Sequence, residues 1–242
     1  MSSMTPRPEG RGFGLESLLS LMQLSDSLFP SGAFAHSYGL EQLAREGVLR
    51  RPEELQRYVE SLLRQTLAPC DGTAALRAFE AAHANDLAPV IDADRALYRT
   101  KAPYELRAAS LATGRRLIDE VSPHLEAPFL REYASAVKAD RSLGTQPVAF
   151  GVVCAALGVS DGESVVASLL LVSATAVLQA SMRLMPISHR DVQATLHYLR
   201  PIIATLAWDL TSGGARPLRS FQPLQDIASM RHEVATARLF AS

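Results

Sequence analysis

The sequence is poor in the residues that build metal modules, disulfide scaffolds and basic binding surfaces. Its 242 residues include two cysteines, two lysines and one tryptophan. Cys70 and Cys154 lie far apart and have no Cys-x-x-Cys partner, so neither a zinc module nor a disulfide framework is expected. The 24 basic and 25 acidic residues nearly cancel, which leaves no electrostatic footprint for nucleic acid or a membrane. We therefore expect a reduced, cytoplasmic setting and partners recognised by shape.

Catalytic and cofactor motifs are also scarce. The sequence has no P-loop, and no histidine occurs in a His-x-x-x-His pair or beside a cysteine, so we expect no nucleotide, metal or other cofactor. The one catalytic pattern is Gly158-Val-Ser-Asp-Gly162, in which Ser160 would be the nucleophile of a serine hydrolase. In a hydrolase this pattern forms a nucleophile elbow, a sharp turn that follows a strand. Here the residues before the pattern are helical in spacing, and Ser160 with Glu163 fits a helix capping box. We expect a non-catalytic protein and keep the hydrolase as the alternative.

No stretch alternates β-branched and aromatic residues as a strand would, and apolar residues recur instead at helical spacing. The sequence predicts an all-α fold, a single globular bundle of roughly ten helices. Pro52 followed by two glutamates is a favourable first turn for a helix that continues through Leu67. Further helices are expected over residues 73–84, 87–100, 103–120, 125–139, 147–157 and 188–210, the last with a kink at Pro201.

The most apolar stretch, about residues 161–184, is expected to be the central helix. It is nearly long enough to cross a bilayer. Polar residues such as Ser173 and Gln179 interrupt it, and no aromatic belt flanks it, which favours a core helix wrapped by others over a membrane span.

Three regions are expected along the chain. Residues 1–14 resemble a disordered tail without the apolar core of a signal peptide. Residues 15–210 form the helical core domain, and residues 211–242 form a linker and a C-terminal segment. That segment has its own amphipathic pattern but would be marginal as an isolated helix. It should either dock on its own domain or fold on a partner.

One stretch, residues 21–41, is hard to explain as generic core. Pro30 and Gly32 interrupt a helical pattern, and aromatic residues surround the break. A buried corner between two helices is one interpretation. In the other, Pro30, Gly32 and Gly39 shape a turn that takes part in assembly.

Three segments resemble the urease accessory protein UreF family. The first is Gln23-Leu-Ser-Asp-Ser-Leu-Phe-Pro-Ser-Gly-Ala-Phe-Ala-His-Ser-Tyr-Gly-Leu-Glu, the second is Arg183-Leu-Met-Pro-Ile, and the third is Asp226-Ile-Ala-Ser-Met-Arg-His-Glu followed by Arg238-Leu-Phe-Ala-Ser. They occur in the family's order and span nearly the whole chain. Ala33, Thr236 and Ala241 depart from the family's pattern, and Ala33 resists the positive φ that a glycine would allow.

The resemblance implies a non-catalytic scaffold that dimerises, binds UreD (also called UreH) and recruits the GTPase UreG. The assembly would couple GTP hydrolysis to nickel insertion into apo-urease. Arg183 would be a candidate for influencing the GTPase; the alternative, which its position at a helix end favours, is a side chain that snorkels at the rim of the core. The residues expected to bind partners are Phe34, His36, Ser37, Tyr38, Glu41, Arg183, Asp226, Ser229, Met230, Arg231, His232, Glu233, Arg238, Leu239 and Phe240.

Overall fold

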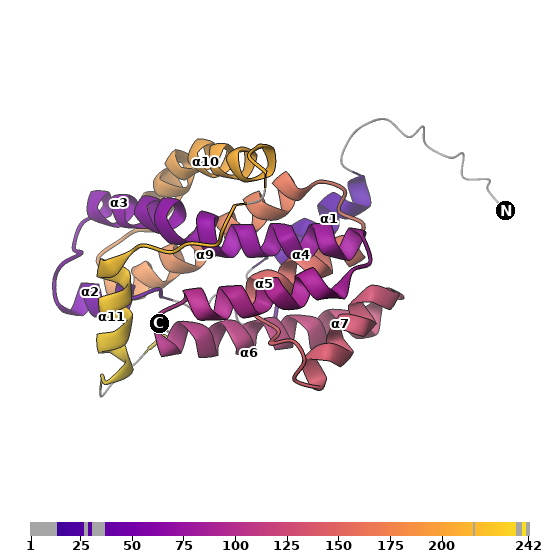
Figure 1. Ribbon diagram of the computed structural model, residues 1–242. Helices are drawn as coiled ribbons and strands as arrows, with labels where there is room; N and C mark the ends of the chain where they lie inside the picture. The colour runs from indigo at the N-terminus through magenta and orange to yellow at the C-terminus, as the bar shows by residue number, and fades with distance from the viewer. Residues whose placement is uncertain (1–13, 27–28, 31–36, 215, 236–238, 241–242) are drawn as a thin grey trace.

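The computed structural model describes residues 14–26, 29–30, 37–214, 216–235 and 239–240. These residues form helices and no strand, which confirms the all-α prediction. The α-helices are α1 (Leu15–Leu24), α2 (Leu40–Arg45), α3 (Pro52–Leu62), α4 (Thr73–His83), α5 (Leu87–Thr100), α6 (Tyr104–Val121), α7 (Pro128–Lys138), α8 (Gln146–Ala156), α9 (Gly162–Leu184), α10 (His189–Ser212) and α11 (Pro223–Glu233). Figure 1 shows α11 at one end of the bundle, beside α2 and α6.

The central helix is α9, as the sequence predicts. Val165 and Leu169 belong to a core shared with α4 to α8, whereas Val166 and Leu170 belong to a second core shared with α2, α3 and α10. A helix that serves two cores must be apolar on several sides. By length and composition α9 could cross a bilayer, but 67% of its most apolar window is buried inside the fold.

The segment between α3 and α4 is helical rather than a break. A π-helical stretch, Leu63–Gly72, joins the two helices and contains Pro69. In an α-helix the N–H of residue 69 would bond the carbonyl of Gln65, but proline has no N–H. The Gln65 carbonyl accepts the Phe221 N–H at 3.0 Å, and the Pro69 carbonyl accepts the Arg219 N–H at 3.2 Å. The irregular helix therefore holds the segment that leads to α11.

The capping box predicted for Ser160 is wrong. Helix α9 begins at Gly162, and its N-cap is Asp161, whose carboxylate accepts the Ser164 N–H at 2.7 Å. Asp161 is in the extended conformation that an N-cap requires, and its carboxylate suits the positive end of the helix dipole. Helix α8 precedes this turn, so the strand needed by a nucleophile elbow is not present around Ser160.

A buried carboxylate organises the loop between α7 and α8. Asp94 of α5 is fully buried and accepts hydrogen bonds from two side chains, the Tyr133 and Ser142 hydroxyls, at 3.2 and 2.6 Å. It also accepts the backbone N–H groups of residues 143, 144 and 145, at 3.1, 2.8 and 2.9 Å, and the Thr145 hydroxyl. Because most of these donors are buried and would otherwise have no acceptor, Asp94 determines the path of the loop.

Candidate functional site: the C-terminal docking site

The turn before α2 brings the chain into contact with α11. Tyr38 and Gly39 have positive φ values of 49° and 80°, and the Tyr38 carbonyl accepts the Tyr58 hydroxyl. A Cβ atom on Gly39 would lie 3.0 Å from the Gln225 carbonyl oxygen and 3.3 Å from Ser229 Oγ, both on α11. Glycine is therefore needed here both for the backbone conformation and for the close approach of α11.

Glu41 of α2, two residues after Gly39, binds the end of the chain. Its carboxylate is buried at 2% exposure. It accepts the backbone N–H groups of Leu239 and Phe240, at 3.1 and 3.0 Å, and it pairs with Arg45 at 3.1 Å. A carboxylate this deeply buried needs such partners, because removing an ion from water costs on the order of several kcal/mol.

His232 of α11 completes the site. Its imidazole is fully buried, with Nε2 3.1 Å from Glu41 Oε2 and Nδ1 2.7 Å from Glu105 Oε2. We call Glu41, Glu105 and His232 the anchor triad. It joins α2, α6 and α11, which are far apart in the sequence and adjacent in Figure 1.

The anchor triad is arranged for docking and not for metal binding. The two carboxylates lie against opposite ring nitrogens of His232, so the three side chains do not converge on one point. Throughout the described part of the chain, no group of three or more His, Cys, Asp or Glu residues could hold a metal ion.

Two further contacts secure α11 and the chain end. The Glu233 carboxylate accepts the backbone N–H groups of Tyr104 and Glu105, at 2.7 and 3.3 Å, and so caps the N-terminus of α6. Arg183, at the end of α9, places its guanidinium 5.8 Å from the centre of the Phe240 ring, within the range of a cation–π contact. The segment predicted to be a terminal unit therefore contacts the core through α2, α6 and α9.

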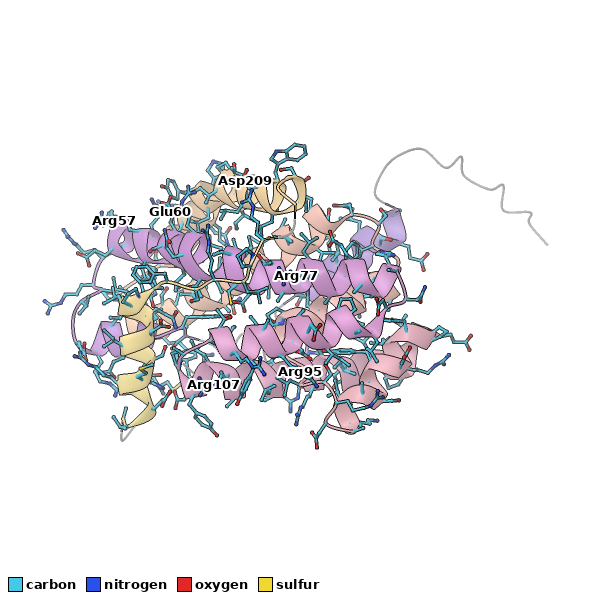
Figure 2. All side chains as sticks on the ribbon, viewed as in Figure 1. Arg57, Glu60, Arg77, Arg95, Arg107 and Asp209 are labelled. Atoms are coloured by element: carbon cyan, nitrogen blue, oxygen red, sulfur yellow. The ribbon has the colours of Figure 1, made fainter. Side chains whose placement is uncertain are left out.

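The segment before α11 is also attached. Arg77 of α4, labelled in Figure 2, donates to the Arg216 carbonyl. Ser61 of α3 donates to the Gln222 side chain at 3.1 Å. Of the two alternatives for the tail, docking on its own domain is the one that the described residues adopt.

Helix α11 buries its polar side and exposes its apolar side. Gln225, Ser229 and His232 face the core with exposures of 0%. The outward stripe has exposures between 45% and 84%. It consists of Leu224, Ile227, Met230 and Val234. In an ordinary surface helix the apolar stripe faces the core, so the orientation of α11 is the reverse of the usual one.

A buried ion pair lies beside the turn and was not predicted. Lys101 Nζ is 2.6 Å from Asp71 Oδ1, and both side chains are buried. Burial by itself would lower the pKa of Lys101, but the Asp71 carboxylate outweighs it and the pKa is raised. Burial raises the pKa of the neighbouring Tyr38 phenol. The only sequence signal was that Lys101 is one of two lysines.

The predicted partner-binding and turn residues fall into four groups. Ser37, Tyr38, Glu41, Ser229 and His232 are buried and contact the chain's own elements, whereas Asp226, Glu233 and Phe240 are partly buried. Arg183, Met230, Arg231 and Leu239 are exposed, as is Pro30 of the predicted turn. Phe34, His36, Arg238 and Gly32 lie outside the described residues. Partner binding by any of these residues stays a prediction.

The role of Glu105 had no sequence signal. It follows Pro103 in the first turn of a helix, where an acidic residue is common for reasons of the helix dipole alone. Only the packing of α6 beside α11 reveals it as the second carboxylate on His232.

The fold and the docking site define an all-helical protein whose N-terminal turn and C-terminal helix are joined by buried charges. A family model described as UreF matches residues 49–200. The urease accessory protein UreF of Bacillus sp. (strain TB-90) is 31% identical over 93% of this chain and 99% of its own length. The UreF of Yersinia enterocolitica is 34% identical over 93% of this chain and 98% of its own length.

A third relative, urease accessory protein UreF 2 of Brucella canis, is 30% identical over 93% of this chain and 92% of its own length. The chain therefore belongs to the UreF family of urease accessory proteins. These relatives are named as accessory proteins, and the expectation of a non-catalytic protein is confirmed on that ground.

Proposed function

We propose that this protein is a cytoplasmic scaffold for urease maturation that binds UreD/UreH and recruits the GTPase UreG. In this role it couples GTP hydrolysis to nickel insertion into apo-urease, and it acts as a homodimer. Membership of the UreF family supports the role in urease maturation. The individual partners follow from the sequence resemblance.

The observation that carries the proposal is the inverted orientation of α11. Ile227 and Met230 are half exposed at the centre of its apolar stripe. Covering exposed apolar surface stabilises a complex by about 25 cal/mol per Å² before the costs of association are subtracted. We assign UreD/UreH to this stripe, because α11 contains Asp226–Glu233, which resembles the family's C-terminal pattern.

The test uses the full chain mixed with UreD/UreH and UreG of the same organism. We expect a complex on a sizing column, and we expect Ile227→Lys with Met230→Lys to abolish it by placing charges in the contact. Trp208→Lys is the matched control, because Trp208 is an exposed apolar residue of another helix, α10. If the unaltered chain runs alone and urease activates normally without it, the proposal is wrong.

Arg183 provides a second test. We propose that it influences the GTPase, and Arg183→Ala should leave the helical circular dichroism unchanged while urease activation falls. Normal activation by this variant would return Arg183 to a structural role at the end of α9. Truncation after Arg219 removes α11 and should abolish partner binding while the core stays helical.

A further inference from the structure

The anchor triad contains more hydrogen-bond acceptors than a neutral histidine can satisfy. A carboxylate oxygen only accepts, and a neutral imidazole carries one N–H. Nδ1 and Nε2 of His232 each face a carboxylate oxygen, at 2.7 and 3.1 Å. With a neutral ring, one nitrogen lone pair of the fully buried imidazole would point at a carboxylate oxygen. The docked geometry therefore calls for a proton on both ring nitrogens.

Among the described residues, the charged groups around His232 come from α2, α6 and α11 itself. From α2, Glu41 faces the ring and is itself paired with Arg45. From α6, Glu105 faces the ring. On α11, the neighbouring Glu233 is engaged with backbone N–H groups of α6. Glu41 receives N–H groups from Leu239 and Phe240, but these donors do not lie between Glu41 and the ring.

We propose that the anchor triad is a proton-dependent latch, which holds α11 and the chain end on the core while His232 is an imidazolium and releases them when the ring loses a proton. Glu41 binds both His232 and the backbone of residues 239 and 240. Opening the latch therefore frees the helix and the chain end together. It also separates the Phe240 ring from the Arg183 guanidinium. The latch acts in the isolated chain and does not depend on which partner binds α11.

The direction of the pH dependence follows from proton linkage. In the released segment, His232 is an ordinary solvated imidazole, which loses its proton at about pH 6.5. The docked triad retains that proton, so docking has its full strength below about pH 6.5. Above it, each docking event takes up one proton, and the opening equilibrium constant rises about tenfold per pH unit.

The experiment is hydrogen exchange of the full-length chain between about pH 6.5 and 9, after correction for the intrinsic exchange rate of each amide. We expect the opening constant of the α11 amides to rise about tenfold per pH unit, while the amides of α9 keep theirs. The ¹⁵N spectrum of His232, assigned by its loss in His232→Gln, should show an imidazolium at pH 7. A neutral ring at pH 7, or opening that does not change with pH, would overturn the latch.

Two substitutions and a control isolate the triad. In Glu105→Gln the side-chain amide can donate to the neutral ring, so α11 should stay docked and its opening should become independent of pH. Glu233→Gln is the matched control, because Glu233 adjoins His232 in sequence and bonds backbone instead of the ring; its pH slope should persist. Should Glu105→Gln fail to fold, His232→Gln must by itself remove the slope. A slope that survives in His232→Gln would assign the effect to another group and refute the proposal.

Discussion

A Cβ atom on Gly39 would lie 3.0 Å from the carbonyl oxygen of Gln225, so the N-terminal turn and the C-terminal helix are in contact through bare backbone. Gly39 also has a φ of 80°, a backbone conformation that residues with a side chain rarely adopt. A substitution of Gly39 is therefore expected to disturb the docking of α11 directly. It also links two segments that lie outside the span matched by the family model.

We expect Gly39→Ala to loosen α11. The substitution costs about 1–2 kcal/mol for the left-handed conformation, and the new methyl group also pushes against the Gln225 carbonyl. Gly214→Ala is the control, because Gly214 has a φ of 70° with no atom within 4 Å of an added Cβ. Hydrogen exchange of the α11 amides and thermal unfolding measure both variants. Equal losses in the two would show that the contact with Gln225 contributes nothing.

We expect Lys101→Met to be strongly destabilising. It leaves the Asp71 carboxylate buried without its cation, which costs about 3–5 kcal/mol of unfolding free energy. Arg64→Met is the control, since Arg64 pairs with Glu60 at 2.8 Å on the surface, where such pairs contribute about 1 kcal/mol or less. Urea unfolding measures both. A loss of stability in Lys101→Met no larger than in Arg64→Met would contradict a structural role for the buried pair.

Asp94→Ala should disrupt the loop between α7 and α8. Each buried donor left without its acceptor costs about 1–3 kcal/mol, and several donors lose Asp94 at once, so we expect a loss of at least about 4 kcal/mol. Asp92→Ala, at an exposed position of the same helix, should change stability by less than about 0.5 kcal/mol. Chemical unfolding compares the two. Proteolysis confined to the loop would indicate local disruption, and equal stability of both variants would refute the role of Asp94.

Much of the helical architecture was predictable because it depends on local pattern. The predicted helix over residues 87–100 coincides with α5, and the central helix predicted at about 161–184 corresponds to α9. Apolar spacing and helix-breaking residues act over a few turns, so the sequence displays them directly. The π-helix around Pro69 was missed because proline normally signals an end, and here the segment before α11 supplies donors to the irregular helix.

By itself the sequence determined the helical class, the apolar central helix and the unusual character of residues 21–41 and 226–240, because these are properties of composition and short-range spacing. Only the tertiary structure decided that the two segments meet, that Glu105 joins Glu41 on His232, and that α11 turns its apolar side outward. Those relationships depend on contacts between residues more than 100 positions apart. No local pattern specifies which buried charge will face which.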